Sequence, residues 1–270
     1  MAMATTAVNE MPLDMAPDSF DNQYQGCGTN MTATLSALNN SEFQRNPLFA
    51  QAWLKATAEW QRRGSPVSPL SSPAQAIALM AFTMDELHTE FNAAVRRARR
   101  SIQEYRDNFH FKTLHFLLTQ ALVTLRQAQN GQCHNVYRGV RTYRFNAKPG
   151  DIVRFGQFSS ASQNEKTAKH IRSATMFQVY TCHGVAIWNF SKYPDEKEVL
   201  IPPYETFEVI KVSQEGEKAR IQLRSNGTFS KYNCEWLQGD ATGGSIPSAP
   251  FLLLGLLLAT TTLAVATGIL

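Results

Sequence analysis

The chain has 270 residues, of which 43% are hydrophobic and 18% charged, and this composition is typical of a globular protein with a buried core. Its formal net charge of +4 is too small to indicate nucleic acid as a partner. The length is enough for one large domain or two small ones.

The first half of the chain is predicted to be irregular and then helical. Residues 1–45 are polar without a clear pattern, so we expect an irregular segment there, followed by a helix over Leu48 to Arg63. Thr83-Met-Asp-Glu86 matches a capping box, and apolar residues then recur every three or four positions, which predicts a helix. A further helix is expected to end near Asn130-Gly131. The two apolar stripes are Leu87, Phe91, Val95, Ala98, Ile102 and Tyr105, and Leu114, Leu117, Leu118, Ala121, Leu122 and Leu125.

Short strand-like runs separated by turn residues follow Gly131. Helices first and strands afterwards predict an α+β fold. We therefore expect one folded domain over residues 46–238. The predicted strands cover residues 136–145, 152–158, 177–182, 199–201, 207–212 and 219–223.

Four cysteines and four N-glycosylation sequons indicate an oxidised, extracytoplasmic protein. The cysteines are Cys27, Cys133, Cys182 and Cys234, and the sequons begin at Asn30, Asn39, Asn189 and Asn226. Four cysteines allow three disulfide connectivities, and their positions alone do not select one.

Two Cys-His pairs raise the alternative of a zinc site. They are Cys133-His134 and Cys182-His183. If both pairs lie on strands, adjacent side chains point to opposite faces, so one tetrahedral ion could not easily collect all four ligands. We therefore predict no metal.

The end of the chain has the pattern of a GPI-anchor signal. Residues 239–250 are mostly small, and the uncharged apolar stretch Phe251–Leu270 follows them. The alternative is a transmembrane helix, because twenty apolar residues can span a bilayer, but no Lys or Arg follows to anchor it. We expect the anchor to be attached within residues 239–244.

The other end carries no visible signal peptide. Met1 to Pro12 has neither a basic region nor an apolar run of sufficient length. Because a GPI signal acts only on a translocated chain, either a first coding segment is missing from this sequence or the chain is not secreted. We expect the first, because the four sequons and four cysteines agree with the pattern at the end of the chain.

The motif Glu196-Lys197-Glu198 runs directly into an apolar, β-branched segment. We expect it to begin a strand, where residues i and i+2 point to the same face. Two carboxylates side by side suit chemistry at a sugar's anomeric carbon, where positive charge develops. The alternative interpretation is a solvated strand entrance.

Two segments upstream carry further candidate residues. Arg138-Gly139 places a phosphate-gripping side chain beside a residue that lets a ligand approach the backbone. The aromatic-rich stretch from Phe155 ends in Ser160-Ala161-Ser162, in which the first serine is the candidate and Ser159 and Ser162 are alternatives.

Arginine, then Ser-x-Ser, then Glu-x-Glu over about sixty residues resembles the R-S-E signature of arginine-specific mono-ADP-ribosyltransferases. The stretches that start at Pro12, Phe20 and Leu200 also look like the vertebrate ecto-enzymes of this family, so the resemblance covers residues 12–237. It implies a helical N-terminal part packed on two small, mostly antiparallel sheets, with an NAD cleft. Residues 46–238 would then form the catalytic domain, with NAD as co-substrate.

The resemblance also implies a role for each motif residue. Arg138, Ser160 and Glu198 would be catalytic and bind NAD, with Gly139 meeting the nicotinamide amide. Glu196 would bind the target guanidinium and help to remove its proton, and neighbouring carboxylates can raise one pKa to suit a base. Tyr193 looks like the substrate-recognising aromatic, although a half-buried loop tyrosine is an alternative.

The remaining implications concern the cysteines and the partners. The resemblance implies the disulfides Cys27–Cys234 and Cys133–Cys182. It implies arginine-bearing cell-surface or secreted proteins as targets, and a location on the extracellular face of the membrane. Three alternatives remain open: an NAD glycohydrolase, a catalytically silent binding protein of the same fold, and a glycosidase that uses Glu196 and Glu198.

Overall fold

The computed structural model of this chain describes residues 9–169, 173–216 and 218–238. The chain divides into two units, Met1–Leu237 and Gln238–Leu270, and the fold described below is that of the first. The predicted spacer, anchor site and apolar tail lie outside the described residues, and so does most of the segment examined for a signal peptide. No helix of the described part is both long and apolar enough to cross a membrane.

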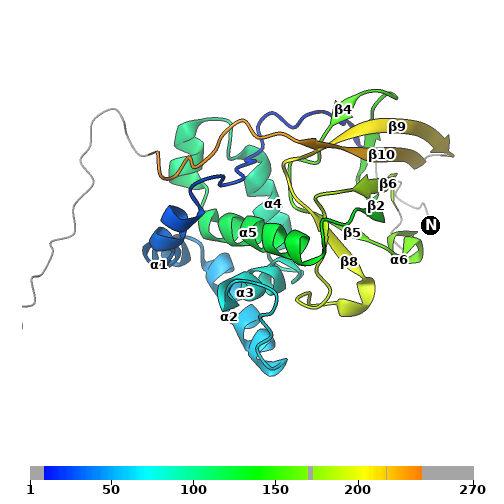
Figure 1. Ribbon diagram of the computed structural model, residues 1–270. Helices are drawn as coiled ribbons and strands as arrows, with labels where there is room; N and C mark the ends of the chain where they lie inside the picture. The colour runs from blue at the N-terminus through cyan, green and yellow to red at the C-terminus, as the bar shows by residue number, and fades with distance from the viewer. Residues whose placement is uncertain (1–8, 170–172, 217, 239–270) are drawn as a thin grey trace, which may run out of the picture. The chain divides into compact units, whose positions relative to one another are not determined.

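The first half of the described chain is helical, as predicted (Figure 1). Helix α5 packs against α1, α3 and strand β7. Its buried stripe of leucines forms part of a core that α1 to α5 share. The helices are α1 (Gly28–Arg45), α2 (Pro47–Arg62), α3 (Pro73–Phe82), α4 (His88–Arg97) and α5 (Lys112–Ala128), with a π-helical turn at Glu104–Asn108.

The expectation that residues 1–45 are irregular is wrong for residues 28–45, which form α1. Few residues of this helix are buried, so its sequence carries little apolar periodicity. Tertiary contacts hold it instead. Cys27 lies directly before it in a disulfide, and the buried Glu42 carboxylate accepts the backbone N–H groups of Lys112 and Thr113, at 2.6 and 2.9 Å.

The predicted capping box at Thr83 is also wrong. Thr83 is the C-cap residue directly after α3, and its hydroxyl donates to the carbonyls of Leu79 and Met80. Helix α4 begins five residues later, at His88, and stops at Arg97, so the apolar stripe from Leu87 to Tyr105 spans a break in the helix. The stripe is nevertheless buried except at Ile102, because the turns after α4 return to the same core.

The strands form an eight-stranded sheet, all of which follows the helices in the chain, and a parallel pair of β1, before the helices, with β3. The order of the large sheet is β4-β9-β10-β6-β2-β5-β8-β7, and only β10 and β6 pair in parallel. The α+β class is therefore confirmed. The strands are β1 (Asn9–Pro12), β2 (His134–Val140), β3 (Tyr143–Asn146), β4 (Ile152–Val153), β5 (Ser159–Ser162), β6 (Thr175–Thr181), β7 (Val185–Ala186), β8 (Glu198–Ile201), β9 (Glu205–Glu215) and β10 (Lys218–Thr228).

The large sheet is nearly divided between β2 and β5. The two strands are joined by a single residue pair, Tyr137 and Ser162, whereas the pairs on either side run over several residues. The expected two small sheets are therefore joined into one sheet by this single residue pair between β2 and β5. The short helix α6 (Glu165–Lys169) packs against β2 and β5 at the same place.

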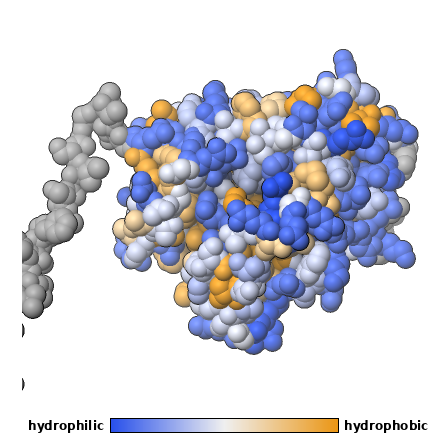
Figure 2. All heavy atoms as spheres, viewed as in Figure 1, coloured by the Kyte–Doolittle hydropathy of each residue, from blue (hydrophilic) through white to orange (hydrophobic). Residues whose placement is uncertain are grey.

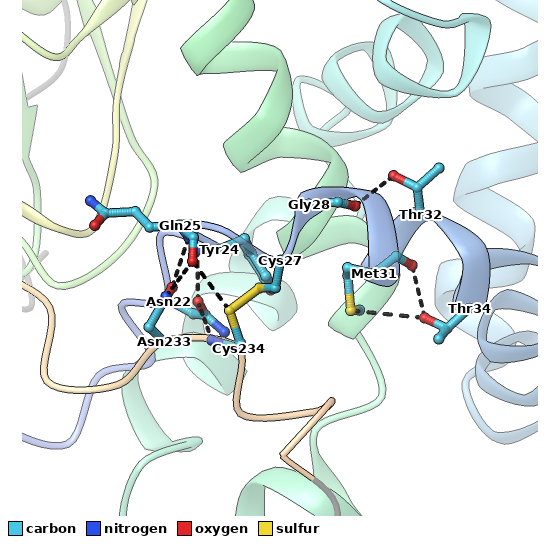
Figure 3. The surroundings of a disulfide bond; sticks show 10 residues. All are labelled: Asn22, Tyr24, Gln25, Cys27, Gly28, Met31, Thr32, Thr34, Asn233 and Cys234. Atoms are coloured by element: carbon cyan, nitrogen blue, oxygen red, sulfur yellow. Dashed lines mark hydrogen bonds between the residues drawn. A yellow bond between two sulfur atoms is a disulfide. The ribbon is translucent and has the colours of Figure 1, made fainter.

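The structure forms two disulfides, and they are the pairs that the resemblance implied. Cys27–Cys234 ties the start of α1 to the C-terminal segment, where Gln25 and Asn233 also exchange hydrogen bonds of 2.8 and 2.6 Å (Figure 3). Cys133–Cys182 joins the chain before β2 to the chain after β6. The cysteines are thus taken by disulfides, and the described residues contain no cluster of three or more potential metal ligands.

Candidate active site

A cavity of about 300 Å³ opens where β2 and β5 part. Three regions of the chain line it: the α3–α4 region, the strands β2 and β5 with α6, and the segment that leads into β8. Its lining residues are Phe82, Thr83, Asp85, His88, Asn92, Tyr137, Arg138, Gly139, Phe158, Ser160, Ala161, Ser162, Thr167, Ala168, Tyr193, Glu196 and Glu198. All of the candidate residues Arg138, Gly139, Ser160, Tyr193, Glu196 and Glu198 are therefore brought together.

The sheet itself aligns the arginine, the serine and the second glutamate. Arg138 lies on β2, and its Nη1 donates to the carbonyl of Ser160 on β5, at 2.6 Å. Strand β5 pairs antiparallel with β8, which begins at Glu198, and Ser162 lies opposite Glu198. The sequence order R, S, E thus becomes three adjacent strands around one cavity.

Arg138 is half-buried, and burial lowers the pKa of its guanidinium to about 10, while the nearby Glu198 carboxylate raises it. It therefore stays cationic at neutral pH. A cation shielded from bulk water attracts a phosphate group more strongly than an exposed one does. Gly139, the next residue of β2, pairs with Met176 of β6 and also lines the cavity.

Glu198 is the most buried acid of the cavity, with 5% of its surface exposed. Burial raises the pKa of its carboxyl, and hydrogen bonds from Ser160 and Ser191 lower it. The nearby Glu196 raises this pKa and His88 lowers it to a smaller extent. Ser191 donates its hydroxyl to Oε2 of Glu198, at 2.9 Å. The carboxylate is thus held in place by hydroxyl groups while one part of it faces the cavity.

The expectation that Glu196 and Glu198 share a strand face is wrong, although both line the cavity. Glu196 ends a short 3-10 helix (Pro194–Glu196, η2), and β8 starts only at Glu198. Between them, Lys197 has φ 49° and ψ 48°, a left-handed conformation that breaks the alternation of a strand. The two carboxylates therefore approach the cavity from different local structures.

The alternatives for the serine differ in where their hydroxyl groups go. Ser159 is fully buried, does not line the cavity, and donates to the carbonyl of Gln157. Ser162 lines the cavity, but its hydroxyl donates to the backbone carbonyl of Glu196, at 2.6 Å. Ser162 thus anchors the Glu196 turn, and Ser160 is the serine of this stretch whose hydroxyl lowers the pKa of Glu198.

Tyr193 stands at the mouth of the cavity with 40% of its surface exposed. Its hydroxyl donates to Oδ2 of Asp85, at 2.9 Å, and this carboxylate raises the pKa of the phenol. Tyr193 is thus a half-exposed loop tyrosine that borders the cavity, and its role in substrate recognition stays a prediction.

Sequence reasoning missed the contribution of the α3–α4 region, from which Asp85, His88 and Asn92 line the cavity. Asn92 is buried, and its amide donates to the carbonyl of Phe158, at 2.9 Å, while its Oδ1 has no partner. The pattern around Thr83 predicts a helix cap, and no local signal indicates that this turn contacts Lys192, 109 residues away.

The four sequons differ in exposure. Asn30, Asn189 and Asn226 are exposed. Asn39 is half-buried on α1, and its Oδ1 is buried without a partner. The first three are therefore the more accessible positions for a glycan, and occupancy of all four remains a prediction.

Comparison with known proteins agrees with this geometry. The chain matches the family described as NAD:arginine ADP-ribosyltransferase over residues 13–231. It is 50% identical over 234 residues to the erythroblast NAD(P)(+)–arginine ADP-ribosyltransferase of Gallus gallus, covering 86% of this chain and 78% of that protein. It is 46% identical over 246 residues to the GPI-linked NAD(P)(+)–arginine ADP-ribosyltransferase 1 of Homo sapiens, covering 85% and 75%.

Solved structures show the same fold. The crystal structure of the eukaryotic mono-ADP-ribosyltransferase ART2.2 superposes with a TM-score of 0.72 at 36% identity, covering 84% of this chain and 98% of that one. A variant of the same protein in complex with NAD gives a TM-score of 0.72 at 35% identity, with the same coverage.

Proposed function

Because this chain belongs to the NAD:arginine ADP-ribosyltransferase family, we propose that it transfers ADP-ribose from NAD to arginine side chains of proteins and releases nicotinamide. The observation that supports this most directly is the convergence of Arg138, Ser160 and Glu198 on one cavity. The cavity offers a shielded cation for the phosphates of NAD and a fixed carboxylate for the reacting sugar, so its residues fit this substrate.

Glu198 supplies the main electrostatic contribution to the reaction. Cleavage of the nicotinamide–ribose bond leaves positive charge on the sugar, and a carboxylate that is already fixed in place stabilises this charge without reorganising. Ser191 holds the carboxylate through its hydroxyl group, and the Ser160 hydroxyl lowers the pKa of the carboxyl. Ser160 also lies where it can position the ribose, since its carbonyl is bound to Arg138.

Glu196 is proposed to receive the acceptor. A guanidinium is a poor nucleophile while it is protonated, so an acceptor arginine needs a carboxylate that binds it and removes a proton. Glu196 lines the cavity from the turn before β8, and Tyr193 lies at the mouth on the same segment. The arginine is therefore proposed to enter between these two side chains.

We further propose that the enzyme acts at the outer cell surface, held by a GPI anchor, on arginine-bearing surface or secreted proteins. The two disulfides, the exposed sequons and the relatives named as GPI-linked support this proposal. The small-residue stretch and apolar end of the sequence have the matching composition.

One assay separates this function from its alternatives. The protein is incubated with NAD labelled in its adenylate part and an arginine-rich protein, and the label that becomes attached is treated with neutral hydroxylamine. Transfer to arginine predicts labelled protein that releases its label to hydroxylamine. Free ADP-ribose without labelled protein would indicate an NAD glycohydrolase, and no turnover of NAD would indicate a silent binding protein or a glycosidase.

A further inference from the structure

A second, open groove of about 460 Å³ adjoins the catalytic cavity. It lies between the C-terminal half of α2 and the turn at residues 84–86. The face of this unit that is visible in Figure 2 is mostly hydrophilic. The groove is lined by Lys55, Ala58, Glu59, Arg62, Met84, Asp85, Glu86, Lys192 and Tyr193.

The groove and the cavity share a wall. Tyr193 and Asp85 line both, and the hydrogen bond between them, 2.9 Å long, forms the boundary. A side chain that enters the cavity beside Glu196 passes Tyr193. The polypeptide that carries this side chain can then continue over the Tyr193–Asp85 pair into the groove.

The groove is fixed rigidly to the segment that leads to Glu198. Arg63, which follows α2, donates to the carbonyls of Ser191 and Lys192, at 2.7 and 2.9 Å. Glu59 of the groove accepts from Arg63 at 2.9 Å and lies 3.5 Å from Nζ of Lys192. A chain that binds in the groove would therefore be held in a defined position relative to the reacting groups.

The charges in the groove balance. Three basic residues, Lys55, Arg62 and Lys192, face three acidic ones, Glu59, Asp85 and Glu86. Lys55 and Glu86 form an exposed ion pair of 2.7 Å, with 56% and 51% of their side chains accessible. The exposed Ala58 and the half-buried Met84 provide short apolar contacts. This surface suits a polypeptide of mixed polarity rather than a nucleic acid or a lipid surface.

We propose that this groove is the docking surface for the polypeptide segment that adjoins the target arginine. The proposal rests on the proposed function and deepens it, since it separates recognition of the acceptor protein from the chemistry on the guanidinium. It predicts that the enzyme distinguishes a peptide acceptor from a small guanidine, and that residues outside the cavity cause the difference.

The test compares two acceptors on each variant: a synthetic peptide with one central arginine, and agmatine, which has the guanidine without a polypeptide. Ala58→Trp fills the groove, and Ala37→Trp, at an exposed position of α1, is the matched control. We expect Ala58→Trp to raise KM for the peptide about tenfold with kcat unchanged, because uniform binding is lost. Its KM for agmatine and its NAD hydrolysis should equal those of the control. Equal changes for both acceptors, or no change for the peptide, would overturn the proposal.

A second variant tests the charges without adding bulk. Lys55→Glu removes the ion pair with Glu86 and leaves the groove negative. Peptides with lysine next to the arginine should then gain in kcat/KM over peptides with glutamate there, and the gain should shrink with added salt. An unchanged ratio between the two peptides would contradict docking in the groove. If wild-type protein modifies neither peptide nor agmatine, the proposed function fails instead, so the two failures are distinguishable.

Discussion

Ser191 and Glu198 are joined by a hydrogen bond of 2.9 Å, and neither side chain is more than 5% exposed. The same serine oxygen accepts the backbone N–H of Tyr193, at 3.1 Å. One hydroxyl group thus connects the proposed catalytic carboxylate with the segment that carries the aromatic residue at the mouth of the site.

Ser191→Ala should shift the pH dependence of NAD cleavage. Burial raises the pKa of Glu198, and the Ser191 hydrogen bond is one of the interactions that lower it. Because the ionised carboxylate is the active form, activity falls as pH drops through this pKa. Loss of the hydroxyl should raise the pKa further and move the acid limb of the kcat/KM profile to higher pH. Ser191→Thr, which keeps the hydroxyl, should return the acid limb to its wild-type pH. An acid limb that does not move in Ser191→Ala would show that Ser191 does not lower the pKa of Glu198.

Glu198→Gln should abolish both arginine transfer and NAD hydrolysis, because the charge that stabilises the sugar cation is lost. Removal of such preorganised stabilisation typically costs about 3–4 kcal/mol or more of transition-state energy. Turnover is measured with labelled NAD, with and without acceptor. Near-normal turnover in a folded variant would refute the assignment of Glu198.

The same variant should not lose stability at neutral pH. The folded-state pKa of Glu198 is raised, so the stability that its protonated form contributes is lost as pH rises through that pKa. The neutral glutamine avoids this loss. We expect its Tm to equal or exceed that of the wild type above the pKa, and the gain to vanish in acid. A clear drop in Tm at neutral pH would indicate that the ionised carboxylate stabilises the fold.

Glu196→Gln should separate the two reactions. The amide has neither the charge to hold a guanidinium nor the basicity to deprotonate it, whereas Glu198, Ser160 and Arg138 are unchanged. Transfer should collapse while slow NAD hydrolysis survives, with both rates measured on one preparation. Equal loss of both reactions would place Glu196 in the NAD site, and unchanged transfer would remove it from acceptor binding.

Loss of the Cys27–Cys234 disulfide should destabilise the domain strongly. The two cysteines are 207 residues apart, and closing so long a loop is worth roughly 4–5 kcal/mol in the chain-entropy model. The double variant Cys27→Ser/Cys234→Ser is compared with wild type by denaturant unfolding. Non-reducing peptide mapping of protein from cells should show this pair, and four free thiols would argue against an extracellular location.

Asp21→Asn should destabilise the domain by about 3–5 kcal/mol, because it leaves a buried charge without its partner. Asp21 and Arg154 are 2.6 Å apart and almost completely inaccessible to solvent. Arg154 also donates to the carbonyls of Ala16 and Phe229, so the pair joins both ends of the domain. Lys55→Ala is the control, since its ion pair with Glu86 is exposed and should contribute little. Equal effects of both changes on unfolding would contradict this reasoning.

The sequence by itself determined the elements with strong periodicity and the chemical types of the site residues. Helices α2 and α5 and strand β8 follow from their apolar patterns, and Arg138, Ser160 and Glu198 follow from their motifs. Such features are local, because the spacing of apolar residues that marks a helix or a strand involves only neighbouring positions.

Tertiary structure decided the features that depend on distant partners. Helix α1 is mostly polar and is held by the Cys27–Cys234 disulfide and by Glu42, so no local pattern reveals it. The turn after Thr83 became a wall of the cavity because the hydroxyl of Thr83 accepts the backbone N–H of Lys192, 109 residues away. Lys197 took a left-handed conformation while the Ser162 hydroxyl bound the carbonyl of Glu196. The residue types of the candidate site are thus local information. The direction from which each side chain enters the cavity is set by contacts between residues far apart in the sequence.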